Sequence, residues 1–172
     1  MGTEQIMIMG MGCLINCDEG FGIHVLERLK QCYAFPKNVH VIDGSVLGTS
    51  LLGVISQPDH LIVIDVLRRG GKAGEFYRLA GKKTADILEG KLAHYQSEFW
   101  DALVMCRALD KVPETVILGV EPEDVDTCSA DLSPALREKV APMVTLILSE
   151  LDRLGVPYKP GVTDDGTCQY PI

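Results

Sequence analysis

The chain has 172 residues, of which 47% are hydrophobic, and this is enough for one domain with a sizeable core. Its formal net charge of −8 argues against nucleic acid and anionic membranes as partners. No segment has the roughly 18 apolar residues that a membrane span needs, and the N-terminus lacks the basic region of a signal peptide. We therefore expect a cytoplasmic protein.

The first half of the chain alternates between apolar runs and helical patterns. Residues 5–10 form a nearly continuous apolar run, which is typical of a strand buried on both faces. Apolar residues then recur at helical spacing over residues 21–33, which predicts an amphipathic helix. Three further elements are expected before residue 70: a strand at residues 39–43, a short helix through Leu51 and Leu52, and a buried strand at residues 60–67.

The second half continues this alternation. Residues 75–79 form a plausible strand that follows Asp65 too closely for a helical crossover, so we expect this strand to run antiparallel. Ser133 followed by Pro134 is a favourable start for a final helix that reaches about Leu154. The other expected elements are a helix at residues 98–109 and a strand at residues 115–120.

Strands that alternate with helices favour a three-layer α/β/α fold. We expect a doubly wound, mostly parallel sheet of about five strands, with residues 1–158 forming a single domain. Residues 159–172 have too little apolar content to pack on their own, so we expect them to form a mobile tail.

The chain contains six cysteines. We expect reduced thiols, because a chain of this length without a secretion signal seldom depends on disulfides. Cys32 and Cys106 fall on the apolar faces of predicted helices and are expected to be buried. Cys13 and Cys17 have a spacing that could hold a soft metal, but no second Cys/His pair follows at zinc-finger spacing.

The opening loop, GMGCLINCDEGFG, occupies a place where many α/β proteins bind a phosphate. It lacks the third glycine of a dinucleotide-binding fingerprint and the Gly-Lys-Ser/Thr ending of a P-loop. Asp18 and Glu19 would also repel a phosphate at the start of the following helix. The simplest structural interpretation is helix capping, with Asp18 at the N-cap and Glu19 in the first turn.

A second acidic residue suggests a functional interpretation. Asp65 directly follows the apolar run of its strand, and ligands of open α/β sheets bind outside the carboxyl ends of the strands. If the first strand lies beside the strand at residues 60–67, Glu19 and Asp65 converge there, and two close carboxylates need a proton, a cation or a metal. Among the four histidines, His94 lies in a predicted loop from which it could reach this crevice. Two carboxylates and one imidazole suit a divalent ion such as nickel or zinc.

These residues, in this order, resemble the hydrogenase maturation proteases. The resemblance covers roughly residues 5–156 and rests on four stretches: GMGCLINCDEGFGIHVLERL, HLIVIDVL, LAHYQSEFWDAL and VILGVEPEDVDTCSADLSP. It implies an endopeptidase that removes the C-terminal extension of a nickel-loaded [NiFe] hydrogenase large-subunit precursor. It also implies that Glu19, Asp65 and His94 match the nickel-binding positions of the family. The family usually has Asn where this chain has Cys13, which affects the expected geometry of the loop.

The resemblance implies that the nickel is carried by the substrate, although another divalent ion could bind in isolation. Two mechanisms stay open: a metal-bound water attacks the scissile carbonyl with a carboxylate as base, or Glu19 and Asp65 act as a catalytic acid–base pair. We expect a monomer whose partner is the hydrogenase precursor. The alternative is a non-enzymatic nickel-binding or docking module. A small-molecule binder of the flavodoxin-like class would need the phosphate loop that this sequence lacks.

Overall fold

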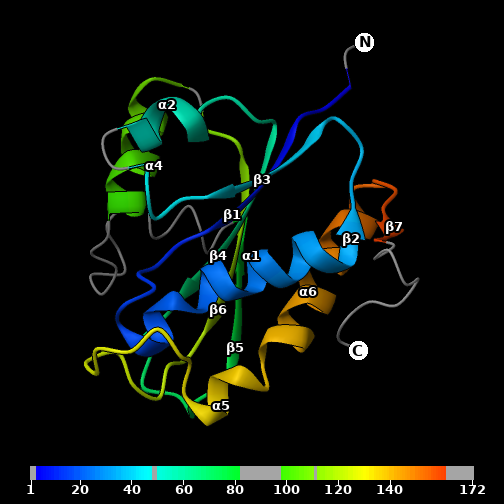
Figure 1. Cartoon of the computed structure of the whole chain (residues 1–172). Helices are drawn as coiled ribbons and strands as arrows, with labels where there is room; N and C mark the ends of the chain where they lie inside the picture. Colours follow the sequence, from blue (N-terminus) through cyan, green and yellow to red (C-terminus); the bar gives the residue numbers. More distant parts are fainter. Residues whose placement is uncertain (1–2, 48–49, 82–97, 111, 162–172) are drawn as a thin grey trace.

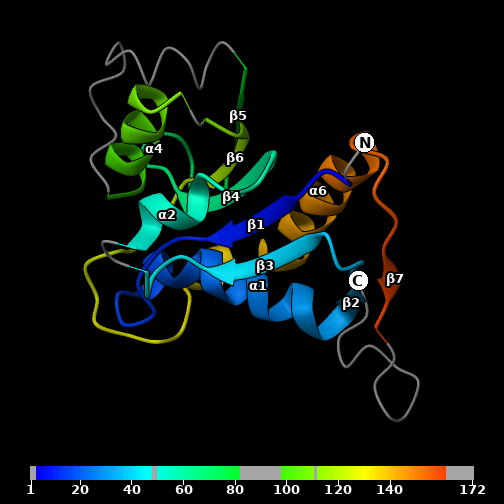
Figure 2. The ribbon, with the colours of Figure 1, turned by 90° about the horizontal axis from the view of Figure 1, so that it is seen from above.

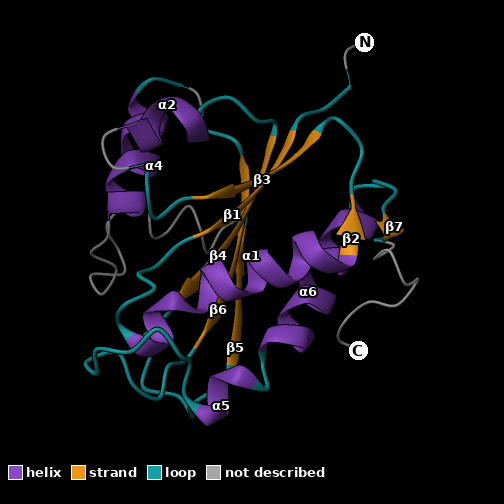
Figure 3. Ribbon diagram, viewed as in Figure 1, coloured by secondary structure: helices purple, strands orange, loops and turns teal. Residues whose placement is uncertain are grey.

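The computed structural model describes residues 3–47, 50–81, 98–110 and 112–161, which form a central sheet with helices on both faces (Figure 1). The sheet has five strands in the order β3 (Val39–Asp43), β1 (Ile6–Gly10), β4 (His60–Val66), β6 (Glu114–Val120) and β5 (Phe76–Ala80). Four of these strands are parallel, and β5 runs antiparallel to β6 (Figure 3). The expected doubly wound, mostly parallel sheet is therefore confirmed, including its antiparallel strand.

The pairing of β1 with β4 fixes the position of the candidate site. Gly10, the last residue of β1, pairs with Ile64, so Asp65 lies just beyond the end of β1. The chain leaves β1 toward β3 on one side and later continues with β4 on the other side, which reverses the strand order at β1. Crevices at such reversals are the usual ligand sites of α/β sheets.

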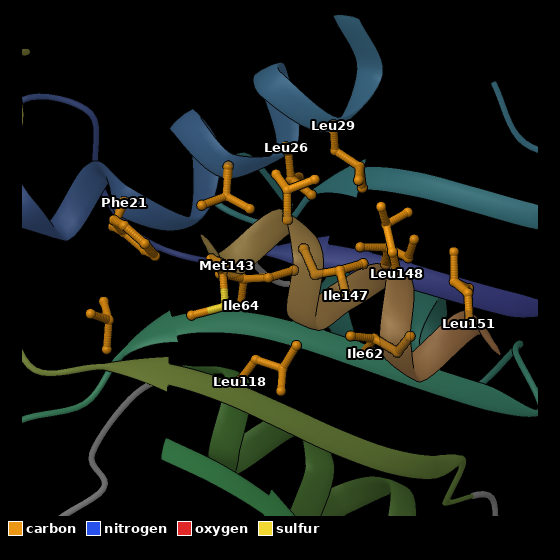
Figure 4. Close-up of a cluster of buried hydrophobic side chains, with 14 of the residues drawn as sticks. Phe21, Leu26, Leu29, Ile62, Ile64, Leu118, Met143, Ile147, Leu148 and Leu151 are labelled. Atoms are coloured by element: carbon orange, nitrogen blue, oxygen red, sulfur yellow. The ribbon is translucent and has the colours of Figure 1, made fainter. Parts of the chain in front are cut away.

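Two helix pairs cover the two faces of the sheet (Figure 2). Helices α1 (Phe21–Cys32) and α6 (Val140–Arg153) pack on one face, and α2 (Leu51–Ile55) and α4 (Glu98–Ala108) pack on the other. Figure 4 shows the larger core, where side chains of both helices meet strand residues such as Ile64 and Leu118. No helix in the described ranges is long and apolar enough to cross a membrane.

The final helical segment differs from the expected single helix, because it is divided into α5 (Pro134–Arg137) and α6. Ser133 caps α5 as expected, with its Oγ accepting the Leu136 N–H at 3.3 Å. Pro142 explains the division. It has no N–H to donate to the carbonyl of Glu138, and its ring would clash with that carbonyl in a continuous helix. A proline is tolerated only in the first turn, so a new helix begins at Val140.

A small second sheet, which the sequence did not predict, fastens the end of the described chain. Strand β2 (Tyr33–Ala34) pairs antiparallel with β7 (Lys159–Pro160), and the Gly161 N–H donates to the Cys32 carbonyl at 2.7 Å. Residues 162–172 of the expected tail lie outside the described residues.

The two cysteines predicted to be buried, Cys32 and Cys106, differ in oxidation state. Cys106 is a buried free thiol, as expected. Cys32 is also buried but is disulfide-bonded, so the expectation of a reduced thiol is wrong there. Composition indicates whether disulfides are common in a class of proteins, whereas one particular bond depends on how closely the fold brings two cysteines together.

Candidate active site

Glycines of the opening loop bring the end of β1 and the start of α1 into backbone contact. A Cβ at Gly10 would collide with the backbone of Gly22, and a Cβ at Gly22 would collide with the carbonyl of Met11. At Gly12, where φ is 130°, a Cβ would collide with the carbonyl of Glu19. These glycines therefore serve close backbone packing, which holds Glu19 beside the end of β1.

Asp18 does not cap a helix, so the capping interpretation is wrong for this residue. A short 3₁₀ turn, η1 (Cys17–Gly20), precedes α1 and makes Gly20 the N-cap of α1. The fully buried Asp18 carboxylate instead accepts three backbone N–H groups, each at 2.8 Å, from residues of the segment that follows β6. The donors are Glu123, Asp124 and Ser133. Asp18 thus fastens residues 121–133 to the opening loop.

Glu19 differs from its neighbour because its side chain is 33% exposed. One carboxylate oxygen, Oε1, lies 3.4 Å from Nη2 of Arg68, and the other, Oε2, accepts from Nδ2 of Asn16 at 3.2 Å. Arg68 belongs to the loop that follows β4. Glu19 therefore presents partly exposed oxygens to solvent and to whatever binds at this edge of the sheet.

Asp65 is the next-to-last residue of β4 and is partly buried. Its Oδ1 accepts the N–H of Val66 at 2.8 Å. Burial raises the pKa of Asp65 to about 7; the Val66 N–H opposes this rise, and the negative charge of Glu19 adds to it. Strand pairing and the contact of the 3₁₀ turn η1 with β4 place Glu19 and Asp65 in one region, at the carboxyl ends of β1 and β4.

Comparison with known proteins identifies the family. The family model described as "Hydrogenase maturation protease" matches residues 23–150. The chain belongs to the hydrogenase maturation protease family. It is therefore a peptidase, and the alternative of a non-enzymatic module is not supported.

Relatives and solved structures agree with this assignment. The chain is 28% identical to the hydrogenase 2 maturation protease of Escherichia coli over 154 residues, which cover 88% of this chain and 93% of the relative. It is 30% identical over 158 residues to the hydrogenase expression/formation protein HoxM of Azotobacter vinelandii, covering 91% of this chain and 76% of HoxM. The solved structure of the hydrogenase maturating endopeptidase HybD from E. coli superposes with a TM-score of 0.81 at 26% identity, covering 91% and 97% of the two chains.

The histidines of this maturation protease separate into two groups. His24 on α1 has its Nε2 3.1 Å from the carbonyl oxygen of Ala130, near the candidate site. His40 and His60 lie near the amino ends of β3 and β4, away from the site, and Nε2 of His60 lies 3.2 Å from Oε2 of Glu4. His94 lies outside the described residues, so its predicted position is not tested.

A metal ion would find two suitable oxygen donors in Glu19 and Asp65. Within residues 3–47, 50–81, 98–110 and 112–161, however, no group of three His, Cys, Asp or Glu side chains is placed to hold a metal ion. The two carboxylates fit a divalent ion as a partial set that needs at least one more ligand. Cys13 and Cys17 are free thiols, and they are part of no such group.

Sequence reasoning missed the role of Glu121. This buried carboxylate accepts the N–H of Arg69 at 2.8 Å, the N–H of Gly70 at 3.0 Å and the hydroxyl of Tyr77 at 2.8 Å. Burial opposes its ionisation, but these donors hold the pKa of Glu121 below its ordinary value. Burial and the bond to Glu121 raise the pKa of Tyr77 to about 12. The signal was present, since Glu121 directly follows a buried strand, as Asp65 ends the apolar run of another.

Proposed function

We propose that this peptidase removes the C-terminal extension of a nickel-loaded [NiFe] hydrogenase large-subunit precursor. We further propose that Glu19, Asp65 and His94 recognise the nickel that the substrate carries. The observation that supports this best is the pair of interacting carboxylates, Glu19 and Asp65, at the strand-order reversal of a hydrogenase maturation protease. Relatives named for hydrogenase maturation support the choice of substrate.

Both carboxylates have the properties needed to detect a cation. With a pKa of about 7, Asp65 is about half protonated at neutral pH. Glu19 is partly exposed and can present an oxygen lone pair to an incoming protein. A divalent ion presented by the substrate would supply positive charge to both carboxylates, and the proton on Asp65 would leave. The pair can therefore respond to the presence of the metal.

In a mechanism without a metal ion on the carboxylates, the same residues can serve the cleavage step. A carboxyl group with a pKa near the working pH is suited to accept a proton and to return it. We assign this role to Asp65, whose Oδ1 accepts the Val66 N–H and whose Oδ2 accepts no hydrogen bond from the residues that the structure describes. It would take a proton from the attacking water and deliver it to the leaving amine. Glu19, beside it, would orient the scissile peptide and share the acid–base work.

Processing of a nickel-loaded precursor tests this proposal. Glu19→Gln and Asp65→Asn remove one charge each with little change in shape, and we expect each to slow trimming at least about a hundredfold. Glu114→Gln is the matched control, because this glutamate lies at the opposite end of the strands, at the start of β6, and its side chain is 76% exposed. The readout is the mass of the precursor over time, with circular dichroism as a check of folding. Trimming at the wild-type rate by both site variants would refute the assignment.

We also propose that the protease acts in the cytoplasm as a monomer. The precursor proposed as substrate supports the first point. Sedimentation of the purified protein tests the second, since a dimer would double the measured mass.

A further inference from the structure

We propose that Arg68 weakens the binding of free divalent cations at Glu19 and Asp65, so that the site favours a metal ion whose charge anionic ligands of another protein already neutralise. Arg68 is thus a specificity-determining residue for the metal. This inference rests on the proposed function, since it concerns the same two carboxylates.

The position of Arg68 at the site is the first observation. Its Nη2 lies 3.4 Å from Oε1 of Glu19, and its side chain is 61% exposed. Among the residues that the structure describes, no other cation is paired with Glu19. The guanidinium therefore lies beside Glu19 at the surface, where an ion that approaches this carboxylate would meet its charge.

The backbone next to Arg68 is held in place by a buried carboxylate. The backbone directly after it, at Arg69 and Gly70, is held by the buried carboxylate of Glu121. The neighbouring Arg69 points elsewhere, because its guanidinium carbon lies 5.1 Å from the centre of the Tyr77 ring. Two adjacent arginines thus have separate surroundings: the first contacts a site carboxylate, and the second stacks on an aromatic ring.

Charge decides which metal ions such a guanidinium would exclude. A free aqueous Ni²⁺ or Zn²⁺ carries two positive charges and is repelled by a guanidinium a few ångströms away. A metal that another protein already holds with anionic ligands has little net charge, and its ligands are attracted to Arg68. Because Arg68 is mostly exposed, solvent and salt weaken the repulsion, and the side chain can swing aside when a protein surface docks.

Titration of the purified protease with NiCl₂ and with ZnCl₂ at neutral pH and low salt tests the inference by calorimetry. We expect Arg68→Gln to bind free metal about tenfold more tightly than wild type, and added NaCl to reduce this difference. Arg68→Lys keeps the charge and should bind like wild type. Arg69→Gln, the matched control, removes the neighbouring charge from the Tyr77 ring and should also bind like wild type. The inference would be overturned if Arg68→Gln bound no metal or bound it no more tightly than wild type. It would also be overturned if Arg69→Gln bound metal as tightly as Arg68→Gln.

A competition assay gives a second readout. During processing of nickel-loaded precursor, free ZnCl₂ should inhibit Arg68→Gln at about one-tenth of the concentration that inhibits wild type. Glu19→Gln separates the two proposals in the titration. If Glu19→Gln still binds metal like wild type, the proposed metal recognition fails. If Glu19→Gln loses binding while Arg68→Gln does not tighten it, only the role of Arg68 fails.

Discussion

Replacement of Asp18 by Asn tests whether this carboxylate holds the segment after β6 in place. Oδ2 of Asp18 accepts two N–H groups and Oδ1 accepts a third, all at 2.8 Å, and the side chain is fully buried. An Asn side chain has one acceptor oxygen, so it can keep the two donors of Glu123 and Asp124 but must turn its NH₂ group toward the N–H of Ser133. One buried donor then lacks a partner, and the remaining bonds lose their charge.

The cost of Asp18→Asn follows from these contacts. A buried donor without an acceptor costs about 1–3 kcal/mol, and the loss of charge assistance in two bonds costs about 1 kcal/mol more. We therefore expect the free energy of unfolding to fall by about 2–4 kcal/mol. For a chain of this size that lowers Tm by roughly 4–16 °C.

Urea denaturation followed by circular dichroism measures this loss, and the adjacent residue supplies the control. Glu19→Gln removes a carboxylate one position later, but that side chain is partly exposed and its partner Arg68 is mostly exposed, so the change in stability should stay within about 0.5 kcal/mol. A loss below about 0.5 kcal/mol in Asp18→Asn, or a larger loss in Glu19→Gln, would refute this account of the loop.

Three further predictions concern other buried charges. Because the pKa of Asp65 rises from its ordinary value of 3.8 to about 7, the folded state holds its proton more tightly than the unfolded state. The contribution of Asp65 to the free energy of unfolding is therefore fully present below about pH 4 and is lost as the pH rises through about 7. The free energy of unfolding of Asp65→Asn, measured with urea, should lack this part of the pH dependence. Glu121→Gln should lower the pKa of Tyr77 from about 12 toward its ordinary value of 10, measured by ultraviolet titration against Tyr77→Phe; an unchanged pKa would contradict the assigned bond. Arg78→Ala removes the 2.7 Å and 2.9 Å bonds to the buried Glu150, which keeps its longer 3.3 Å contact with Arg153, and should destabilise the fold by about 1–3 kcal/mol. Arg78→Ala combined with Glu150→Ala should cost less than the two single losses together.

The strands could be predicted because burial on both faces leaves a continuous apolar run. Strands β1 and β4 have such runs, and their adjacency follows from the topology of doubly wound sheets. The antiparallel direction of β5 followed from the short connection after β4. In contrast, β2 and β7 have two residues each, which is too short for any hydrophobic period to appear.

The candidate site was only partly predictable for a different physical reason. Glu19 and Asp65 each lie close to a strand end that the sequence reveals, so their placement at the same end of the sheet follows from topology. The role of Asp18 depends on backbone donors 105 to 115 residues later in the chain, and backbone N–H groups have no signature in a sequence. The third expected ligand, His94, lies outside the described residues and stays a prediction.

The adjacent residues Asp18 and Glu19 have different surroundings because of the turn in which they lie. Cys17, with φ of 47°, begins η1, and the Asp18 side chain then turns inward to the segment after β6 while Glu19 faces the loop after β4. Glu121 closes the arrangement by binding the loop after β4 from the end of β6. The loops after β1, β4 and β6 are thus fastened to one another by buried carboxylates that accept backbone N–H groups. Such fastening fixes Glu19 and Asp65 before any substrate arrives, which is the preorganisation that the proposed recognition of a loaded metal site requires.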